Sequence, residues 1–261
     1  MKTKAVVDHI VNWLSAYSEN SKTNGFVVGI SGGIDSAVTS ALAARTGKPV
    51  LCVEMPIYQA KSQMDRASKH IDKLMAEFSN VSRIEVELTP VFDAFLNAIA
   101  ENQGPSHDMA LVNTRARLRM TTLYYYAGLH GALVAGTGNK VEDFGVGFYT
   151  KYGDGGVDLS PIADLYKSEV YAIAKEMDVI DEIMKAAPTD GLWGDDRTDE
   201  DQIGASYPEL EWAMEFIAQG GVEETLSGRE LEVYKIYRRL NGMNQHKMNP
   251  IPVCVIPADL K

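Results

Sequence analysis

Residues 25–36 read Gly-Phe-Val-Val-Gly-Ile-Ser-Gly-Gly-Ile-Asp-Ser, which is the pattern of a buried strand, a glycine turn and the start of a helix. The apolar run at residues 26–30 is typical of a strand in the middle of a parallel sheet, where both faces are covered. Gly32 and Gly33 predict a turn, because adjacent glycines allow positive φ and leave room for backbone N–H groups to face one concavity. An alanine-rich helix is predicted next, with the positive end of its dipole at the same place. The stretch therefore predicts a phosphate-binding loop.

Asp35 occupies the position where a Walker-type loop has its lysine. A carboxylate repels a polyphosphate unless a cation lies between them. Asp35 therefore predicts a divalent metal ion, Mg²⁺, shared with the phosphates. A plainer interpretation is a strand-to-helix turn in which Asp35 caps the helix, and glycine-rich turns alone do not separate the two.

The composition is that of a globular protein. Of the 261 residues, 45% are hydrophobic, which is enough for one large α/β core, and we expect a single domain. The formal net charge of −11 argues against a general nucleic-acid binder, which would carry a basic face. Cys52 and Cys254 each lie in an apolar run, which indicates buried side chains rather than ligands, nucleophiles or a disulfide. The chain shows neither a signal peptide nor a run that could span a membrane, so we expect a cytoplasmic protein.

Strand and helix alternate along the chain after the loop. Further strands are expected at residues 50–55, 84–88 and 132–135. Helices are expected at residues 60–78, 91–99, 109–129, 167–177, 210–218 and 229–241, and a strand-like apolar tail closes the chain. This alternation predicts an α/β fold with a doubly wound, mostly parallel sheet flanked by helices. Ligands of such sheets bind at the carboxyl ends of the strands, where the glycine loop also lies.

Three arginines open the helix expected at residues 109–129. Arg115 and Arg119 are four residues apart and share a face, whereas Arg117 points elsewhere. A solvated helix face is one interpretation, and a phosphate or carboxylate partner is the other.

Two loops later in the chain have compositions that indicate function. Residues 148–158 are rich in glycine and aromatic side chains, which favours an ordered functional loop. Residues 187–201 form the most acidic loop, and its part at 190–201 is either a solvated segment or a lid over the substrate. Glu142 and Asp143 follow the sharp turn at residues 136–140, between the strand expected at residues 132–135 and the loop at residues 148–158. One of these acids could complete a metal site with Asp35.

The unit Ser31-Gly32-Gly33-Ile34-Asp35-Ser36 resembles the pyrophosphate-binding loop of the N-type ATP pyrophosphatases, which split ATP into AMP and pyrophosphate. Within this adenine nucleotide alpha hydrolase-like superfamily, the order and spacing of four further segments resemble those of the ammonia-dependent NAD synthetases. The segments are Gly136-Thr137, residues 148–158, Ala187-Pro188-Thr189 and His246-Lys247. The match runs from the first helix to the C-terminus.

The resemblance implies a reaction and a set of roles. Deamido-NAD would be converted to NAD when its nicotinate carboxylate attacks the α-phosphate of ATP, pyrophosphate leaves, and ammonia displaces AMP from the acyl adenylate. The implied ATP site consists of Gly29, Ile30, Ser31, Gly32, Gly33, Ile34, Asp35, Ser36, Thr137, Lys167 and Thr189, of which Asp35, Lys167 and Thr189 are the catalytic residues. The implied Mg²⁺ ligands are Asp35 and Glu142. The implied deamido-NAD ligands are Arg117, Lys151, Asp158, His246 and Lys247.

This chain departs from the family pattern at one place. It has one residue more than the common pattern between Glu142 and Lys151, so Asp143 could take the metal position instead of Glu142. The residues from Lys151 onward are unaffected.

The resemblance also implies a nitrogen source and an assembly. Glutamine-dependent relatives carry an amidase domain with a catalytic cysteine, and the expected organisation here is a single NAD synthetase domain at residues 1–261 with no glutaminase domain. Free ammonia is then the expected donor unless a separate subunit supplies it. Family members are homodimers with the dinucleotide site near the interface, and no nucleic-acid or membrane partner is expected.

Two other functions fit parts of the sequence. A tRNA-modifying ATP pyrophosphatase would favour a basic RNA-binding appendage or paired reactive cysteines, and neither is evident. A non-catalytic ATP-binding module would need fewer convergent polar groups than the motifs spread along this chain.

Overall fold

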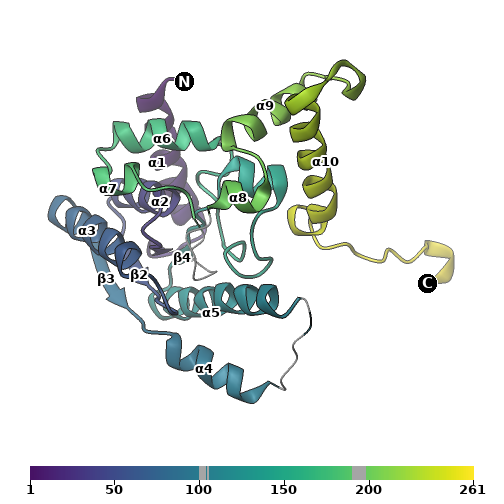
Figure 1. Ribbon diagram of the computed structural model, residues 1–261. Helices are drawn as coiled ribbons and strands as arrows, with labels where there is room; N and C mark the ends of the chain where they lie inside the picture. Colours follow the sequence, from purple (N-terminus) through teal and green to yellow (C-terminus); the bar gives the residue numbers. More distant parts are fainter. Residues whose placement is uncertain (100–103, 105, 190–197) are drawn as a thin grey trace.

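A parallel sheet of four strands lies at the centre of the computed structural model, which describes residues 1–99, 104, 106–189 and 198–261. The strands are β1 (Phe26–Gly29), β2 (Val50–Glu54), β3 (Val81–Glu85) and β4 (Leu133–Val134). Their order is β3-β2-β1-β4 and every pairing is parallel (Figure 1). The chain order reverses between β1 and β4, which confirms the doubly wound sheet and marks the ligand-binding edge.

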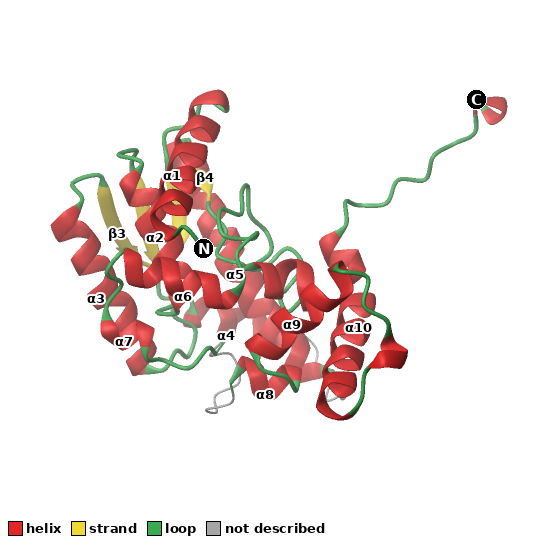
Figure 2. Cartoon of the chain, turned by 90° about the horizontal axis from the view of Figure 1, so that it is seen from above, coloured by secondary structure: helices red, strands yellow, loops and turns green. Residues whose placement is uncertain are grey.

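Helices cover both faces of this sheet (Figure 1, Figure 2). On one face are α1 (Thr3–Asn20), α2 (Ile34–Arg45), α3 (Lys61–Glu77), α6 (Lys167–Glu176) and α7 (Asp181–Met184). On the other are α4 (Thr89–Ala98) and α5 (His107–His130). β1 shows why the layers form: Phe26 and Val28 pack in the first core and Val27 in the second, because successive strand side chains point to opposite faces.

A third cluster of helices stands beside the sheet. It contains the π-helical turn η1 (Val141–Val146), α8 (Asp199–Ile203), α9 (Tyr207–Ala218) and α10 (Gly228–Met248), which share a core around Leu210 and Val233. Figure 2 shows α8, α9 and α10 gathered at one side of the molecule. Short 3-10 turns lie at η2 (Glu223–Thr225) and η3 (Ala258–Leu260). In the part of the chain that the structure describes, none of the helices is long and apolar enough to cross a membrane.

The third strand lies three residues earlier than the alternation at residues 84–88 predicts. Its register is set by β2, because Val50 pairs with Val81 and Glu54 with Glu85. The Asn80 side chain fixes its start by donating hydrogen bonds to the carbonyls of Ala44 and Lys48. Beyond Glu85 the chain turns toward α4, so the later part of the apolar alternation belongs to the connection.

Two expectations about the C-terminus are wrong. The tail at residues 250–257 forms no strand, and it leaves the body of the molecule after α10 (Figure 1). Cys254 is therefore exposed, whereas Cys52 is buried in the sheet as expected. The sequence pattern was apolar enough for burial, but α10 directs the tail away from the sheet.

Candidate functional site

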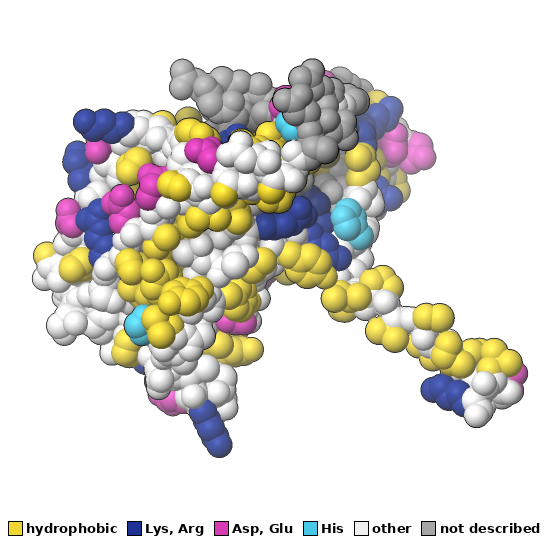
Figure 3. Space-filling model, turned by 90° about the horizontal axis from the view of Figure 1, so that it is seen from below, with side chains coloured by type: hydrophobic (Ala, Val, Ile, Leu, Met, Phe, Trp, Pro, Cys, Tyr) yellow, Lys and Arg dark blue, Asp and Glu magenta, His cyan; other side chains and the backbone are white. Residues whose placement is uncertain are grey.

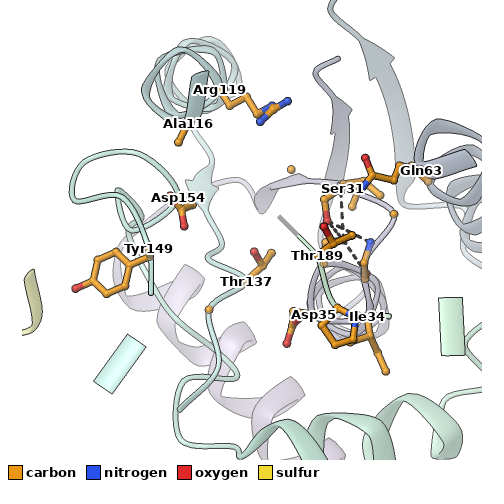
Figure 4. Close-up of a pocket in the computed structure, with 18 of the residues that line it drawn as sticks. Ser31, Ile34, Asp35, Gln63, Ala116, Arg119, Thr137, Tyr149, Asp154 and Thr189 are labelled. Atoms are coloured by element: carbon orange, nitrogen blue, oxygen red, sulfur yellow. Dashed lines mark hydrogen bonds between the residues drawn. The ribbon is translucent and has the colours of Figure 1, made fainter. Parts of the chain in front are cut away.

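A cavity of about 290 Å³ lies at the carboxyl ends of the strands, beside the β1–α2 loop. The loop at residues 29–36 forms one wall, and α3, α5, the turn at residues 136–138 and the loop at residues 148–157 contribute the others. Figure 4 shows Ser31, Asp35, Thr137 and Thr189 around one space, with Gln63 next to Ser31 and Arg119 on the neighbouring helix α5. The cavity lies at the strand-order reversal, where ligands of this fold class bind.

The glycine loop is held in one shape by contacts that leave little room. Gly32 has φ +81°, and a Cβ built on it would lie 2.4 Å from the Gln63 carbonyl oxygen. Gly33 N–H donates to Ser31 Oγ at 3.2 Å, and Ser31 N–H donates to Ser36 Oγ at 3.3 Å. The loop therefore brings backbone and hydroxyl groups to the start of α2, the geometry that favours a phosphate.

Replacing Gly32 with alanine tests this close approach. We expect Gly32→Ala to lower the free energy of unfolding by about 1–3 kcal/mol, because a left-handed φ and the Gln63 carbonyl both oppose the added methyl group. Gly47 also has positive φ, at +73°, but meets nothing within 4 Å. Gly47→Ala is therefore the matched control. Chemical denaturation of both variants measures the difference, and equal losses would contradict the steric role of the Gln63 contact.

A buried ammonium joins two carboxylates at the other wall of the cavity. Lys167 Nζ lies 2.6 Å from Asp35 Oδ2 and 3.0 Å from Glu142 Oε1. Its side chain is only 4% exposed, and each carboxylate side chain is 17% exposed. The three residues come from α2, η1 and α6 and meet at the edge of the sheet that holds the glycine loop.

Burial and mutual attraction set the protonation of this cluster. Burial alone would lower the pKa of Lys167, but the carboxylates of Asp35 and Glu142 outweigh it and raise that pKa, so the ammonium stays charged. Burial raises the pKa of Asp35, with Lys167 opposing the shift. Burial alone would raise the pKa of Glu142, but the attraction of Lys167 and the hydrogen bonds to the carboxylate outweigh it. The pKa of Glu142 is therefore lowered.

Two neutral side chains orient the carboxylates. Asn139 Nδ2 donates to Asp35 Oδ1 at 3.0 Å, and its own oxygen accepts from the N–H groups of Val141 and Glu142. The Tyr207 hydroxyl donates to Glu142 Oε1 at 2.6 Å, and the Lys167 ammonium lies 4.7 Å from the centre of the Tyr207 ring. Burial raises the pKa of Tyr207, with the Glu142 carboxylate acting in the same direction, so the hydroxyl keeps its proton.

Glu142, not Asp143, is joined to Asp35 through Lys167. Glu142 and Asp143 both lie in the π-helical turn η1, where their side chains point to different partners. Asp143 also lines the cavity, but its carboxylate packs on Gly138, where a Cβ would lie 2.1 Å from Asp143 Oδ1. Burial, with Glu142 and Asp154 nearby, raises the pKa of Asp143 to about 8.

The structure brings the predicted ATP residues together. The side chains or backbone of all eleven line the one cavity: Gly29, Ile30, Ser31, Gly32, Gly33, Ile34, Asp35, Ser36, Thr137, Lys167 and Thr189. Of the acidic loop at residues 187–201, residues 190–197 lie outside the described residues, and Thr189 and Asp199 both line the cavity.

The predicted dinucleotide residues lie outside the lining of this cavity. Four of them form a connected group: Arg117 donates to the Lys151 carbonyl at 3.3 Å, Lys151 donates to the His246 carbonyl, and Lys247 donates to the Gly147 and Tyr149 carbonyls. Figure 3 shows Lys and Arg side chains gathered beside a histidine near the root of the C-terminal tail.

Asp158 stands apart from that group. Its carboxylate accepts from the Val134 N–H at 2.8 Å and from the Tyr124 hydroxyl at 3.0 Å. These contacts tie the loop at residues 148–158 to β4 and α5.

Asn139 and Tyr207 belong to the site but are not among the predicted site residues, whereas the sequence had already indicated Arg119 as a possible contact for a phosphate or carboxylate. Arg119 lines the cavity and donates to the Met55 carbonyl at 3.0 Å and to Gln59 Oε1 at 2.9 Å. Its helical spacing from Arg115 was the available signal, and Arg115 itself stacks over Phe92 at 5.2 Å. Asn139 could have been found from its place in the turn after β4, whereas nothing in the sequence marks Tyr207.

The carboxylates suit a hard divalent cation. Asp35 and Glu142 direct carboxylate oxygens toward one point, beside which the Lys167 ammonium lies. Within the described residues, no group of three or more His, Cys, Asp or Glu side chains is placed to hold a metal alone. Two carboxylates suit Mg²⁺, which usually takes one or two carboxylates and completes its shell with phosphate and water oxygens.

Comparison with known proteins gives consistent results. The family model described as NAD synthase matches residues 6–251. The NH(3)-dependent NAD(+) synthetase of Methanococcoides burtonii is 39% identical over 83% of this chain and 81% of its own, and that of Mesoplasma florum is 35% identical over 100% and 99%. Among solved structures, an NMN synthetase from Francisella tularensis superposes with a TM-score of 0.82 at 32% identity, covering 99% of each chain.

Proposed function

The chain belongs to the NAD synthase family, and we propose that the cavity beside the glycine loop is where it binds ATP and activates a carboxylate. The enzyme is a ligase that forms a C–N bond by ATP-dependent amidation. The nicotinate carboxylate attacks the α-phosphate of ATP, pyrophosphate leaves, and ammonia displaces AMP from the acyl adenylate. The observation that carries the assignment to this cavity is the meeting of Asp35, Lys167 and Glu142 beside the glycine loop.

The residues of the cavity have different proposed roles in binding ATP. We assign the pyrophosphate of ATP to the backbone N–H groups at the start of α2, residues 34–36, because a helix N-terminus that follows a glycine loop favours an anion. Lys167 would neutralise charge that develops on the phosphates during transfer. Thr137 and Thr189 both line the cavity and would hold ATP by their hydroxyl groups.

Asp35 and Glu142 are the proposed ligands of Mg²⁺. When bound, Mg²⁺ neutralises phosphate charge and orients the leaving pyrophosphate. Asn139 and Tyr207 support the two carboxylates through the hydrogen bonds described above.

The dinucleotide is proposed to bind beside the ATP cavity. Arg117, Lys151, Asp158, His246 and Lys247 are the proposed ligands of deamido-NAD. The contacts among Arg117, Lys151 and the last turn of α10 support a shared basic surface there. Because this surface is open at the root of the tail, we propose that a second copy of the chain completes it, in a homodimer.

The nitrogen donor is proposed to be free ammonia. The family match covers residues 6–251, and the similar NAD synthetases of Methanococcoides burtonii and Mesoplasma florum are named as NH(3)-dependent. We further propose that the enzyme works in the cytoplasm, where ATP is made available to it.

A mononucleotide is a second candidate acceptor. One of the similar solved structures is an NMN synthetase, and the reacting nicotinate carboxylate is the same in the mononucleotide and the dinucleotide. Family membership leaves no comparable support for a tRNA-modifying enzyme or a non-catalytic ATP-binding module.

An incubation with ATP, Mg²⁺ and ammonium tests the proposal, with deamido-NAD in one reaction and nicotinate mononucleotide in the other. We expect NAD, AMP and pyrophosphate in equal amounts, and a higher kcat/KM for deamido-NAD. A higher kcat/KM for the mononucleotide would reassign the acceptor and keep the amidation. Failure to form AMP with either acceptor would contradict the function.

A further inference from the structure

Tyr207 contacts the proposed metal ligand Glu142 and its ion-pair partner Lys167, although it does not line the cavity. It is 4% exposed. Its hydroxyl donates to Glu142 Oε1 at 2.6 Å, and its ring lies under the Lys167 ammonium at 4.7 Å. One side chain from the third helical cluster is thus in contact with the charged centre of the site.

The position of Tyr207 is fixed from several sides. It is the first residue of α9, and its N–H donates to Glu200 Oε1 of α8 at 2.8 Å. The helix start is closed by a capping box between Ser206 and Glu209, and Glu209 pairs with Arg229 of α10 at 2.7 Å. The ring itself packs in the core shared by η1, α9 and α10. A donor held in this way keeps its place without help from a ligand.

Tyr207 is to Glu142 what Asn139 is to Asp35, a neutral donor beside the shared Lys167. Glu142 lies in the short π-helical turn η1, and its Oε1 accepts from both Tyr207 and Lys167. When Lys167 turns toward a phosphate group, the hydrogen bond from Tyr207 can still hold the carboxylate. Partners of this kind, which orient a metal ligand without touching the metal, commonly matter for affinity and activity.

We propose that Tyr207 is a positioning residue that holds the Glu142 carboxylate toward the cation position. Through it, α9 and α10 set the geometry of the site although they contribute no group to the cavity wall beside Glu142. This inference rests on the proposed role of Glu142 as a metal ligand.

The variant Tyr207→Phe removes the hydroxyl and keeps the ring beneath Lys167. We expect the Mg²⁺ concentration for half-maximal NAD formation to rise about tenfold or more, and kcat to fall by a similar factor. A second measurement does not depend on turnover: the affinity for Mn²⁺ in the presence of ATP, followed by electron paramagnetic resonance, should weaken by about the same factor.

Tyr237→Phe is the matched control, because Tyr237 packs in the same core and also lies outside the cavity lining. It should leave the metal requirement unchanged, and both variants should unfold at similar temperatures. A wild-type Mg²⁺ requirement and Mn²⁺ affinity in Tyr207→Phe would overturn the inference, as would a loss of activity that only follows a loss of folded protein.

Glu142→Gln, measured in parallel, distinguishes the proposed metal role of Glu142 from the proposed positioning role of Tyr207. Wild-type metal dependence in Glu142→Gln would overturn the proposed metal role and the positioning role with it. Weakened metal binding in Glu142→Gln together with wild-type behaviour in Tyr207→Phe would overturn the positioning role alone.

Discussion

Asp35→Asn should lower kcat by at least about 100-fold while the protein stays folded, because a charged group that acts on the transition state is worth this much or more. The substitution removes one negative charge and keeps the shape of the side chain. Asn139 can still donate to the oxygen at this position, and Lys167 keeps its ion pair with Glu142 at 3.0 Å. The packing of α2 against the sheet is therefore expected to survive. Steady-state rates at saturating ATP and Mg²⁺ measure the fall in kcat, and the thermal unfolding midpoint shows whether the protein stays folded.

Asp164→Asn is the control for this result. Asp164 also forms an ion pair, with Lys140 at 2.9 Å, but its side chain is 97% exposed. Its substitution should leave the rate unchanged. Mg²⁺-dependent turnover at the wild-type rate in Asp35→Asn would contradict the metal assignment.

Lys167→Met should affect stability as well as activity. The variant keeps an unbranched, slightly shorter side chain but leaves Asp35 and Glu142 buried without the ammonium that both contact. Breaking a buried ion pair by removing one partner costs about 3–5 kcal/mol, because a charge stays buried without compensation. The rate should also fall by at least about 100-fold, since the charge beside the phosphates is lost. Lys185→Met is the control, because Lys185 pairs with Asp181 on the surface.

The stability lost in Lys167→Met should depend on pH. Burial already raises the pKa of Asp35, and without Lys167 the opposing attraction disappears, so that pKa rises further. A carboxyl whose folded-state pKa exceeds its unfolded value stabilises the fold when protonated, and this contribution is lost as pH rises through the folded pKa. In the wild type the pKa of Glu142 is lowered, so its contribution is present above the unfolded pKa and is lost as pH falls.

Acidification should therefore reduce the loss of stability that Lys167→Met causes relative to the wild type. We expect the difference in unfolding free energy between wild type and Lys167→Met to be smaller at about pH 5 than at about pH 8. Urea denaturation at both pH values measures it. An equal difference at the two pH values, or a variant as stable as the wild type, would contradict the ionised state of the cluster.

The sequence was sufficient for the parts of the site that depend on local pattern. A buried strand followed by two glycines and a helix predicts both the sheet and the loop, and the carboxyl ends of parallel strands meet at one edge. This reasoning placed Asp35 near the turn that holds Glu142. The resemblance to the family added Lys167, which lies 132 residues from Asp35 in the chain and meets it at 2.6 Å.

The parts that were missed depend on packing between distant elements. Tyr207 reaches Glu142 across 65 residues because α9 packs on η1, and no periodicity encodes that contact. The third strand was misplaced because its register is set by pairing with β2 rather than by its own alternation. Cys254 was misplaced because burial depends on where α10 directs the tail, not on how apolar the tail is.

Activation of the carboxylate as an acyl adenylate can be tested by following oxygen atoms from deamido-NAD whose nicotinate carboxylate carries ¹⁸O. Attack of this carboxylate on the α-phosphate forms a bond from its oxygen to phosphorus, and displacement by ammonia leaves that oxygen on AMP. We predict one ¹⁸O in AMP for each NAD formed, and unlabelled pyrophosphate, by mass spectrometry. AMP without label, or label in pyrophosphate or orthophosphate, would show that the carboxylate is activated in another way.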